Sequence, residues 1–336
     1  MRIAILGAGS WGTALGIVFA RQGHRVILWT RTAERAAMVN RTRRHPRFPT
    51  IQLPDTLITT HDPGLTEDAD LVIIAIPTQY VRDVLQTYRF PLQAPVVNVA
   101  KGIERATRLR ISELLREVAA VEVERYAVMS GPSHAEEVVA GLPTAVVVAS
   151  HSPELARWIQ KGLTSATLRI YTSTDVVGVE LGGALKNVIA IAAGIVDGLR
   201  LGHNAKAALI TRGLAEIQRL GIALGAEPHT FAGLSGLGDL VVTCTSPYSR
   251  NRALGERLAR GEALDHIMAS LSEVAEGVPT TEAAYALSQS TGVEMPITAQ
   301  MYAVLFAGRS PQQAVAELLV REAKAEYWWN QVRSLP

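Results

Sequence analysis

MRIAILGAGSWGTALGIVFA, residues 1–20, is the stretch that decides the fold class. Its β-rich run Arg2 to Leu6 leads directly into Gly7-Ala8-Gly9-Ser10-Trp11-Gly12, and an apolar helical pattern follows from Thr13 to Arg21. This order of strand, tight turn and helix is typical of the first unit of a dinucleotide-binding fold. Gly7, Gly9 and Gly12 let the backbone turn and approach a pyrophosphate, whose charge lies on the free N–H groups at the helix start. The stretch therefore predicts a bound dinucleotide.

The same residues also fit a signal peptide, because Arg2 precedes an apolar stretch. The regular glycine spacing favours the dinucleotide turn instead. The other apolar run, Asn187 to Val196, is well short of the ~20 residues that a membrane span needs. We therefore expect no membrane insertion.

The composition is that of a globular protein, since 48% of the 336 residues are hydrophobic and 19% are charged. This length suggests about two domains. A net charge of +2 does not imply a nucleic-acid-binding face. The single cysteine, Cys244, excludes an intramolecular disulfide and a cysteine-rich zinc site, and the histidines show no ligand spacing, so we expect no metal. A reducing cytoplasm fits this cysteine content.

The end of the second predicted strand, Arg25 to Trp29, bears on which dinucleotide is bound. An Asp or Glu about 20 residues after the glycines would bind the ribose 2′-hydroxyl of NAD. The sequence instead reads Thr30-Arg31-Thr32. A guanidinium here suits the 2′-phosphate of NADP, so Arg31 favours NADPH/NADP, with NADH/NAD as a second cofactor. The alternative is a solvated loop arginine.

Two later strands end in residues suited to ligand binding. The run Asp70 to Pro77 is continuously apolar, as in strands that are buried on both faces of a parallel sheet. Beyond it, a strand from Ala94 to Ala100 ends in Lys101, and one from Arg125 to Ser130 ends in Gly131-Pro132-Ser133. Ligands bind at such carboxyl ends, so we expect Lys101 to contact phosphate or substrate. Ser133 also begins an S-x-x-E capping box, which is compatible with anion binding.

The hydrophobic period changes near residues 172–174. From Asp175 onward the sequence is a series of helical patterns, whereas strands and helices alternate before it. We predict an α/β Rossmann-type doubly wound sheet, residues 1–173, which binds NAD(P), followed by an all-α C-terminal domain, residues 174–336, for substrate and catalysis. In the first half, the basic run Arg43-Arg44-His45 is expected to be solvated.

Lys186 is the one cation inside the apolar run from Asp175 to Leu199. On a helix, the residues three and four positions away are small or apolar, Gly182 and Gly183 among them. Such surroundings remove hydration and lower the pKa of a lysine, so it can transfer a proton near neutral pH. The glycines each weaken a helix by roughly 1 kcal/mol relative to alanine, which indicates close approach of another backbone or a ligand. The alternative is a helix-end lysine that extends to water.

A second glycine-rich segment, FAGLSGLGDLVVTCTSPYSRN at residues 231–251, departs from helix-bundle sequence. Asp239 follows three glycines, and Ser249-Arg250-Asn251 opens a predicted helix. Asp239 and Ser249 are candidate helix caps. Arg250 and Asn251 at a helix start would bind phosphate through a guanidinium, an amide and free N–H donors.

Five segments carry a resemblance to a known family: Gly7 to Gly12, SGPSHAEE, ELGGALKN, GLSGLGDL and TCTSPYSRN. With them the chain closely resembles bacterial NAD(P)-dependent glycerol-3-phosphate dehydrogenase, almost from end to end. The resemblance implies reversible reduction of glycerone phosphate to sn-glycerol 3-phosphate for phospholipid synthesis. It also implies a cytoplasmic, commonly dimeric enzyme.

The resemblance assigns roles residue by residue. Lys186 resembles the family's proton donor and acceptor. The residues that resemble its substrate-binding set are Lys101, Gly131, Ser133, Lys186, Asp239, Ser249, Arg250 and Asn251. Those that resemble its cofactor contacts are Ser10, Trp11, Arg31, Lys101, Ala135 and Arg250, with Val274 and Glu276 in a looser match.

Lys186 fits the chemistry that the resemblance implies. Hydride arriving at a ketone carbon leaves negative charge on the oxygen, which an ammonium stabilises and protonates. Two other functions remain open from the sequence. One is a related two-domain dehydrogenase of a β-hydroxyacid or sugar acid, with a carboxylate site in place of a phosphate pocket. The other is a non-catalytic dinucleotide sensor, which would need no proton donor.

Overall fold

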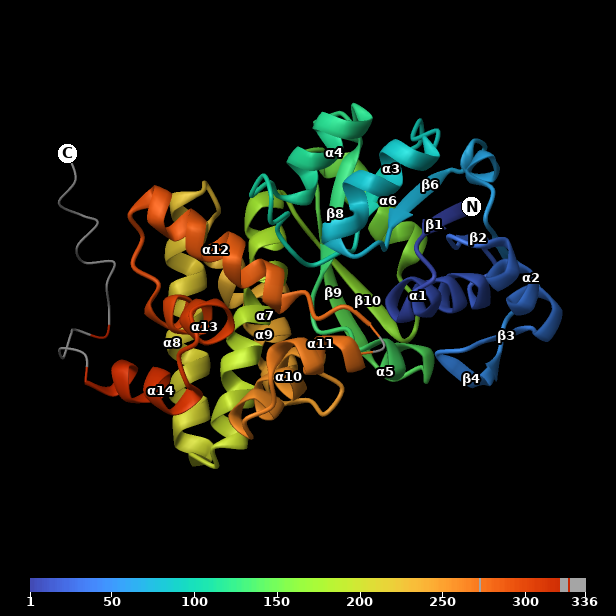
Figure 1. Cartoon of the computed structure of the whole chain (residues 1–336). Coiled ribbons are helices and arrows are strands. Elements are labelled where there is room, and N and C mark those ends of the chain that lie inside the picture. Colours follow the sequence, from blue (N-terminus) through green and yellow to red (C-terminus); the bar gives the residue numbers. More distant parts are fainter. Residues whose placement is uncertain (272, 321–325, 327–336) are drawn as a thin grey trace, which may run out of the picture.

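The largest element is a sheet of eight strands: β1 (Arg2–Leu6), β2 (Arg25–Trp29), β5 (Leu57–Thr60), β6 (Leu71–Ile74), β7 (Val96–Asn98), β8 (Tyr126–Ser130), β9 (Thr144–Ala149) and β10 (Leu168–Ser173). The structure is a computed structural model and describes residues 1–271, 273–320 and 326. Figure 1 shows the sheet on one side, a group of helices on the other, and α7 (Val176–Gly198) where they meet. The predicted Rossmann-type sheet followed by helices is confirmed.

The strand order is β10-β9-β8-β7-β6-β1-β2-β5. All pairs from β5 to β8 are parallel, but β8 pairs antiparallel with β9. Because β9 and β10 are parallel to each other, both run opposite to the rest of the sheet. The sequence pattern does not reveal this reversal, since a strand buried on both faces is apolar in either direction.

Helices cover both faces of the sheet. One face carries α1 (Ser10–Arg21), α2 (Ala33–Thr42), α5 (Ala135–Val139) and α6 (Pro153–Leu163), and the other carries α3 (Val81–Tyr88) and α4 (Ile111–Ala119). In β1, Ile3 and Ile5 pack into the first core, whereas Ala4 and Leu6 pack into the second. Burial on both faces explains why β1 is continuously apolar.

A small antiparallel hairpin, β3 (Arg44–His45) and β4 (Phe48–Gln52), lies outside the main sheet. The prediction that Arg43-Arg44-His45 is solvated is wrong for two of these residues. His45 has an exposed fraction of 0%, and Arg43 donates to the Leu57 carbonyl at 3.1 Å. The local charge suggested that these residues are exposed to solvent, but the hairpin folds back against the body of the sheet half.

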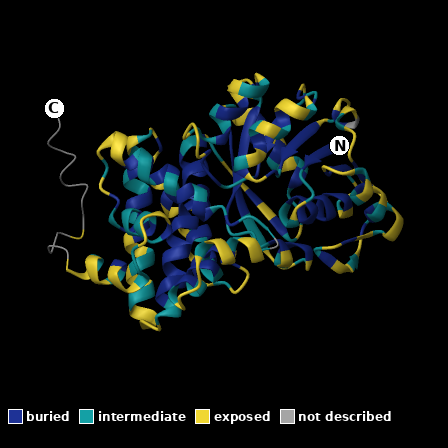
Figure 2. Cartoon of the chain, in the orientation of Figure 1, coloured by how far each residue is buried: buried dark blue, intermediate teal, exposed yellow. Residues whose placement is uncertain are grey.

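The helical half surrounds α7. Its other helices are α8 (Gly202–Ala223), α9 (Asp239–Thr245), α10 (Arg250–Ala259), α11 (Leu264–Ser270), α12 (Gly277–Thr291), α13 (Pro296–Phe306) and α14 (Pro311–Leu319). Asp175 caps α7 by accepting from the Gly178 N–H at 2.8 Å, and its other oxygen accepts from the Glu227 N–H at 2.9 Å. Figure 2 shows α7 as almost entirely buried.

Within the described part of the chain, α7 alone is long and apolar enough to span a membrane by length and composition. The apolar run Asn187 to Val196 is only part of this helix, which begins at Val176. Its most apolar window is 100% buried inside the fold, as in the core helix of a globular domain.

A buried carboxylate joins α7 to the sheet half. Glu180 accepts from the Tyr126 hydroxyl at 2.6 Å, from the Ser112 N–H at 2.8 Å and from Arg110 Nη1 at 2.8 Å. The first turn of α7 also packs into the core that contains α3 and α4. The division at residues 173 and 174 therefore stays a prediction.

Candidate active site

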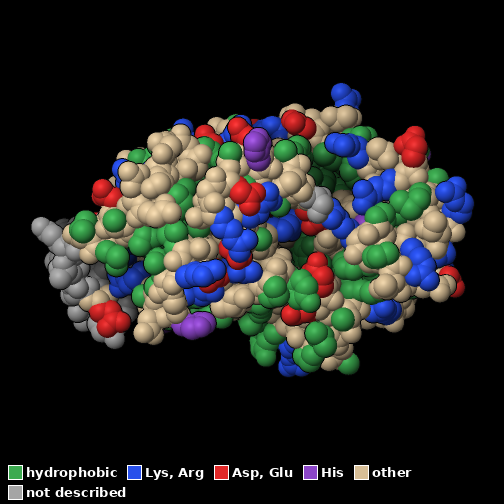
Figure 3. Space-filling view, turned by 60° about the horizontal axis from the view of Figure 1, so that its bottom comes forward, with side chains coloured by type: hydrophobic (Ala, Val, Ile, Leu, Met, Phe, Trp, Pro, Cys, Tyr) green, Lys and Arg blue, Asp and Glu red, His purple; other side chains and the backbone are tan. Residues whose placement is uncertain are grey.

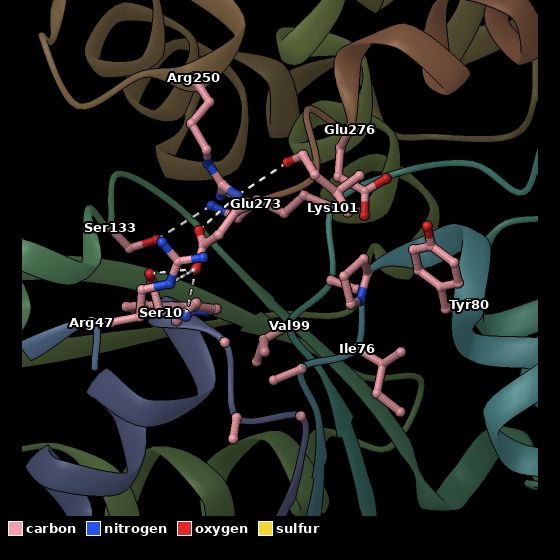
Figure 4. Close-up of a pocket in the computed structure, with 18 of the residues that line it drawn as sticks. Ser10, Arg47, Ile76, Tyr80, Val99, Lys101, Ser133, Arg250, Glu273 and Glu276 are labelled. Atoms are coloured by element: carbon pink, nitrogen blue, oxygen red, sulfur yellow. Dashed lines mark hydrogen bonds and ion pairs between the residues drawn. The ribbon is translucent and has the colours of Figure 1, made fainter. Parts of the chain in front are cut away.

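A cleft with a volume of about 580 Å³ is lined by residues from both halves. The predicted residues that line it are Gly7, Gly9, Ser10, Trp11, Arg31, Lys101, Ser133, Lys186, Ser249, Arg250, Asn251, Val274 and Glu276. Four others, Gly12, Gly131, Ala135 and Asp239, lie outside the lining. Figure 4 shows side chains from both halves pointing toward one another across this space.

The glycine turn leaves room for a ligand at one position and for the protein backbone at another. A Cβ on Gly12 would lie 2.1 Å from the Gly7 carbonyl oxygen, so only glycine fits there. A Cβ on Gly9 would have no atom within 4 Å, and Gly9 gives α1 no side-chain cap. The space beside Gly9 at the start of α1 therefore fits the close approach of a pyrophosphate.

Lys186 is buried, which excludes the alternative that it extends to water. Its side chain is 7% exposed, and its ammonium donates to Asp239 Oδ1 and, at 2.7 Å, to Thr243 Oγ1. Burial lowers the pKa of this ammonium to about 7; Asp239 opposes the shift and Lys101 adds to it. The amine is therefore poised to transfer a proton near neutral pH.

Asp239 connects the two lysines. Lys101 Nζ lies 2.7 Å from Asp239 Oδ2, 3.0 Å from the Gly131 carbonyl oxygen and 3.3 Å from Ser133 Oγ. Burial acts to raise the pKa of the Asp239 carboxyl, but Lys101 and Lys186 outweigh it and the pKa is lowered. Asp239 makes no helix cap, because α9 begins at this residue and Gly238 occupies the cap position. Its predicted capping role is wrong.

The glycines of α7 allow this convergence. A Cβ on Gly183 would lie 2.6 Å from Ser130 Oγ and 3.6 Å from Lys101 Cγ, and one on Gly182 would lie 2.7 Å from the Ser235 carbonyl oxygen. The prediction that another backbone approaches here is confirmed. The helix that carries Lys186 can therefore lie directly against the end of β8.

Ser133 does not form the predicted capping box. The cap position of α5 belongs to His134, whose side chain makes no capping bond. Ser133 Oγ donates to the Gly131 carbonyl at 2.8 Å, and Lys101 donates to Ser133. Ala135, a predicted cofactor contact, is 8% exposed and packs in the core. Its contact with a cofactor stays a prediction.

The three residues of the Ser249-Arg250-Asn251 segment have different roles. Ser249 Oγ caps α10 by accepting from the Arg252 N–H at 3.2 Å, as the capping alternative proposed. Asn251 donates to Asn187 Oδ1 at 3.0 Å and accepts from the Gly277 N–H at 3.0 Å. Arg250 pairs with Glu273 at 2.8 Å, but its side chain is still 50% exposed at the cleft.

Glu276 lines the cleft from the helical half. Its Oε1 accepts from the Thr78 N–H at 2.7 Å, while its Oε2 is buried without a partner, as is Trp11 Nε1. Burial raises the pKa of this carboxyl to about 7. Both residues line the cleft, while these two atoms are buried within its walls.

Sequence reasoning missed several lining residues. Thr243 follows Asp239 by one helical turn, a spacing that would have placed both on one face. Asn187, in the quoted ELGGALKN segment, donates to the Lys101 carbonyl at 3.2 Å. Arg47 and Glu273 form an ion pair of 3.1 Å, which no local pattern indicates because 226 positions separate them (273 minus 47).

Two features bear on whether a metal ion or a nucleic acid could bind. Among the described residues, no group of three or more His, Cys, Asp or Glu side chains could hold a metal ion. On the face in Figure 3, Lys and Arg side chains are dispersed among acidic and uncharged ones. This face therefore carries no continuous basic surface.

Comparison with known proteins agrees with this geometry. The family models described as NAD-dependent glycerol-3-phosphate dehydrogenase N-terminus and C-terminus match residues 2–156 and 175–316. The chain is 52% identical over 329 residues to glycerol-3-phosphate dehydrogenase [NAD(P)+] of Geobacillus thermodenitrificans, covering 96% of each chain. It is 51% identical over 330 residues to the protein of the same name from Nitratidesulfovibrio vulgaris, covering 97% of this chain and all of the relative.

A solved structure shows the same architecture. The crystal structure of glycerol-3-phosphate dehydrogenase from Coxiella burnetii superposes with a TM-score of 0.89 at 39% identity. The match covers 95% of this chain and 99% of that one, so it includes both halves and the cleft between them. The chain therefore belongs to the NAD-dependent glycerol-3-phosphate dehydrogenase family.

Proposed function

We propose that this chain reversibly reduces glycerone phosphate to sn-glycerol 3-phosphate with NADPH or NADH. The observation that carries the proposal is the buried Lys186 amine, which lines the same cleft as the glycine turn at the start of α1. The names of the relatives support the substrate and the cofactor.

When bound, the nicotinamide cofactor supplies the hydride for reduction and accepts it in reverse. Lys186 Nζ then gives a proton to the substrate oxygen that becomes the hydroxyl, and takes it back in the oxidation. Asp239 and Thr243 fix the direction of this amine. Lys101, held by Asp239, adds a second positive charge near the developing oxyanion.

The phosphate group of the substrate needs fixed positive donors. We assign this role to Arg250, with the start of α10, because its guanidinium is exposed to the cleft while Ser249 and Asn251 hold the surrounding backbone. The other predicted substrate residues, Gly131 and Ser133, support Lys101.

The competing functions have less support. A β-hydroxyacid or sugar-acid dehydrogenase would not account for the family match over both halves. A dinucleotide sensor would not need a buried amine with a pKa of about 7. We further propose a cytoplasmic homodimer that supplies glycerophospholipid synthesis, and sedimentation velocity tests the dimer.

A steady-state assay tests the activity. The purified chain is expected to oxidise NADPH and NADH in the presence of glycerone phosphate, and not with β-hydroxyacid precursors or sugar acids. Turnover of only a hydroxyacid would support the related dehydrogenase instead, and dinucleotide binding without any turnover would support the sensor.

A further inference from the structure

A short segment of the helical half crosses the cleft. Residues 273–276, the 273–276 strap, lie between α11 and α12. At one end Glu273 contacts Ser10 in the sheet half, and at the other Glu276 accepts from the Thr78 N–H. The Val274 carbonyl between them accepts from Arg250 at 3.0 Å. The strap therefore lies over the predicted dinucleotide site.

The Glu273 carboxylate has the contacts expected of a bound anion. Its Oε1 accepts from the Ser10 N–H at 3.1 Å and the Ser10 hydroxyl at 2.6 Å, and lies 3.1 Å from Arg47 Nε. Its Oε2 lies 2.8 Å from Arg250 Nη1. Burial opposes ionisation, but Arg250, Ser10 and Arg47 hold the pKa of this carboxyl below its usual range. The group is thus an anion at neutral pH.

The place of this carboxylate is the start of α1. Ser10 is the first residue of that helix, and Gly9 before it provides no side-chain cap. The same N–H group is the one that the glycine turn would direct at a cofactor pyrophosphate. Two anions cannot share it, because each would need the same donors and would repel the other.

The β3–β4 hairpin holds Arg47 in place. Arg47 lies at the turn of this hairpin, and its N–H donates to Nδ1 of the buried His45 at 3.3 Å. The Ala8 backbone in the glycine turn lies close enough to the His45 ring to act to raise its pKa. Burial and the adjacent Arg35 lower the pKa of His45 to about 4, so the ring is neutral and Nδ1 can accept. The hairpin therefore fixes the Arg47 backbone beside the glycine turn.

We propose that Arg47 is a further cofactor-binding residue, which contacts the pyrophosphate, and that Glu273 occupies this phosphate subsite until the dinucleotide displaces it. Figure 4 shows Arg47, Arg250 and Ser10 around the Glu273 carboxylate. The inference rests on the proposed function only in taking the ligand to be a nicotinamide dinucleotide. NADH and NADPH share the pyrophosphate, so both should be affected alike.

The alternative is that Glu273 stays in place when cofactor binds and clamps the two halves together. The two arrangements predict opposite changes in dinucleotide affinity when the Glu273 charge is removed. Under displacement, loss of the carboxylate charge frees the subsite, so a dinucleotide binds more tightly. Under a permanent clamp, the same change loosens the closed cleft and weakens binding.

Calorimetric titration of the full chain with NADH and with NADPH, without substrate, measures this directly. Glu273→Gln and Glu273→Ala are each expected to tighten both cofactors by roughly three- to tenfold. Arg47→Gln is expected to weaken both by about tenfold. Glu262→Gln, which removes the same charge from an exposed pair with Arg257, is the matched control and should change neither.

A double-mutant cycle separates displacement from a general effect of charge. If Glu273 competes for Arg47, the gain from Glu273→Gln becomes smaller in the Arg47→Gln background. An equal gain in both backgrounds, or weaker binding by Glu273→Gln alone, would overturn the proposal. Neither outcome depends on turnover, so a chain that binds dinucleotide without reducing glycerone phosphate still tests it.

Discussion

Lys101 Nζ lies 2.7 Å from Asp239 Oδ2, across the junction between the sheet half and the helical half. The other oxygen of the same carboxylate contacts Lys186. One buried anion thus holds two ammonium groups together, against their mutual repulsion. The charge state of Lys186 therefore depends on residues from both halves, and the site is complete only when the halves are packed.

Lys186→Ala is expected to lower kcat by roughly 10²- to 10⁴-fold, because it removes the group that protonates the developing alkoxide. Cofactor affinity should survive, since the glycine turn is unchanged. Lys206→Ala, which removes a lysine paired with Asp197 outside the cleft lining, is the control. Near-normal kcat in Lys186→Ala, measured by NADPH oxidation, would rule out its role.

The pH dependence of the two directions should be opposite. Reduction needs protonated Lys186, so kcat/KM for glycerone phosphate should fall as the pH rises above about 7. Oxidation needs the neutral amine, so kcat/KM for glycerol 3-phosphate should rise through the same region. Initial rates across this range, at saturating cofactor, measure both. Two profiles that bend in the same direction would contradict the assignment.

Asp239→Asn should move these profiles to lower pH. The carboxylate raises the pKa of Lys186 against burial and Lys101, so its removal lets that pKa fall further below the ordinary value. Reduction at neutral pH is then slower. Asp197→Asn is the control, because Asp197 also bridges two cations, Lys206 and Arg252, but lies outside the cleft lining. An unshifted profile in Asp239→Asn would show that Asp239 acts only on structure.

Some residues of the site could be predicted from the sequence, and others could not. Lys186 was identifiable because a single cation in an apolar helix has few explanations, and its glycines predicted the close approach that is observed. The capping box at Ser133 failed because α5 begins at Ala135 with His134 in the cap position, and Ser133 accepts from Lys101 instead. Ion pairs such as Arg47 with Glu273 depend on the tertiary fold, which local patterns do not encode.

Arg31→Asp tests the cofactor preference. Arg31 is exposed at the cleft, and a carboxylate there would repel the 2′-phosphate of NADPH but accept from the ribose hydroxyl of NADH. We expect the Kd of NADPH to rise by roughly tenfold more than that of NADH. Arg41→Asp, at the other end of α2, controls for net charge. Equal losses for the two cofactors would show that Arg31 does not read the 2′-phosphate.

Glu216→Gln tests a buried carboxyl far from the chemistry. Glu216 on α8 accepts from the N–H groups of Ile297 and Thr298, at 2.6 and 3.2 Å, where α13 begins. Burial raises its pKa from 4.5 to about 7. The folded chain therefore binds this proton more tightly than the unfolded chain, and the contribution to stability is lost as the pH rises from about 4.5 through about 7.

Urea unfolding at several pH values measures the effect. The free energy of unfolding of Glu216→Gln should depend less on pH across this interval than that of the unaltered chain, because the amide does not titrate. Part of the dependence should remain, since burial also raises the pKa of Glu276 to about 7. Glu154→Gln, whose side chain is 78% exposed, should leave the dependence unchanged. If Glu216→Gln matched that control, the carboxyl would already be ionised in the folded chain at acidic pH, and the hydrogen bonds from α13 would outweigh its burial.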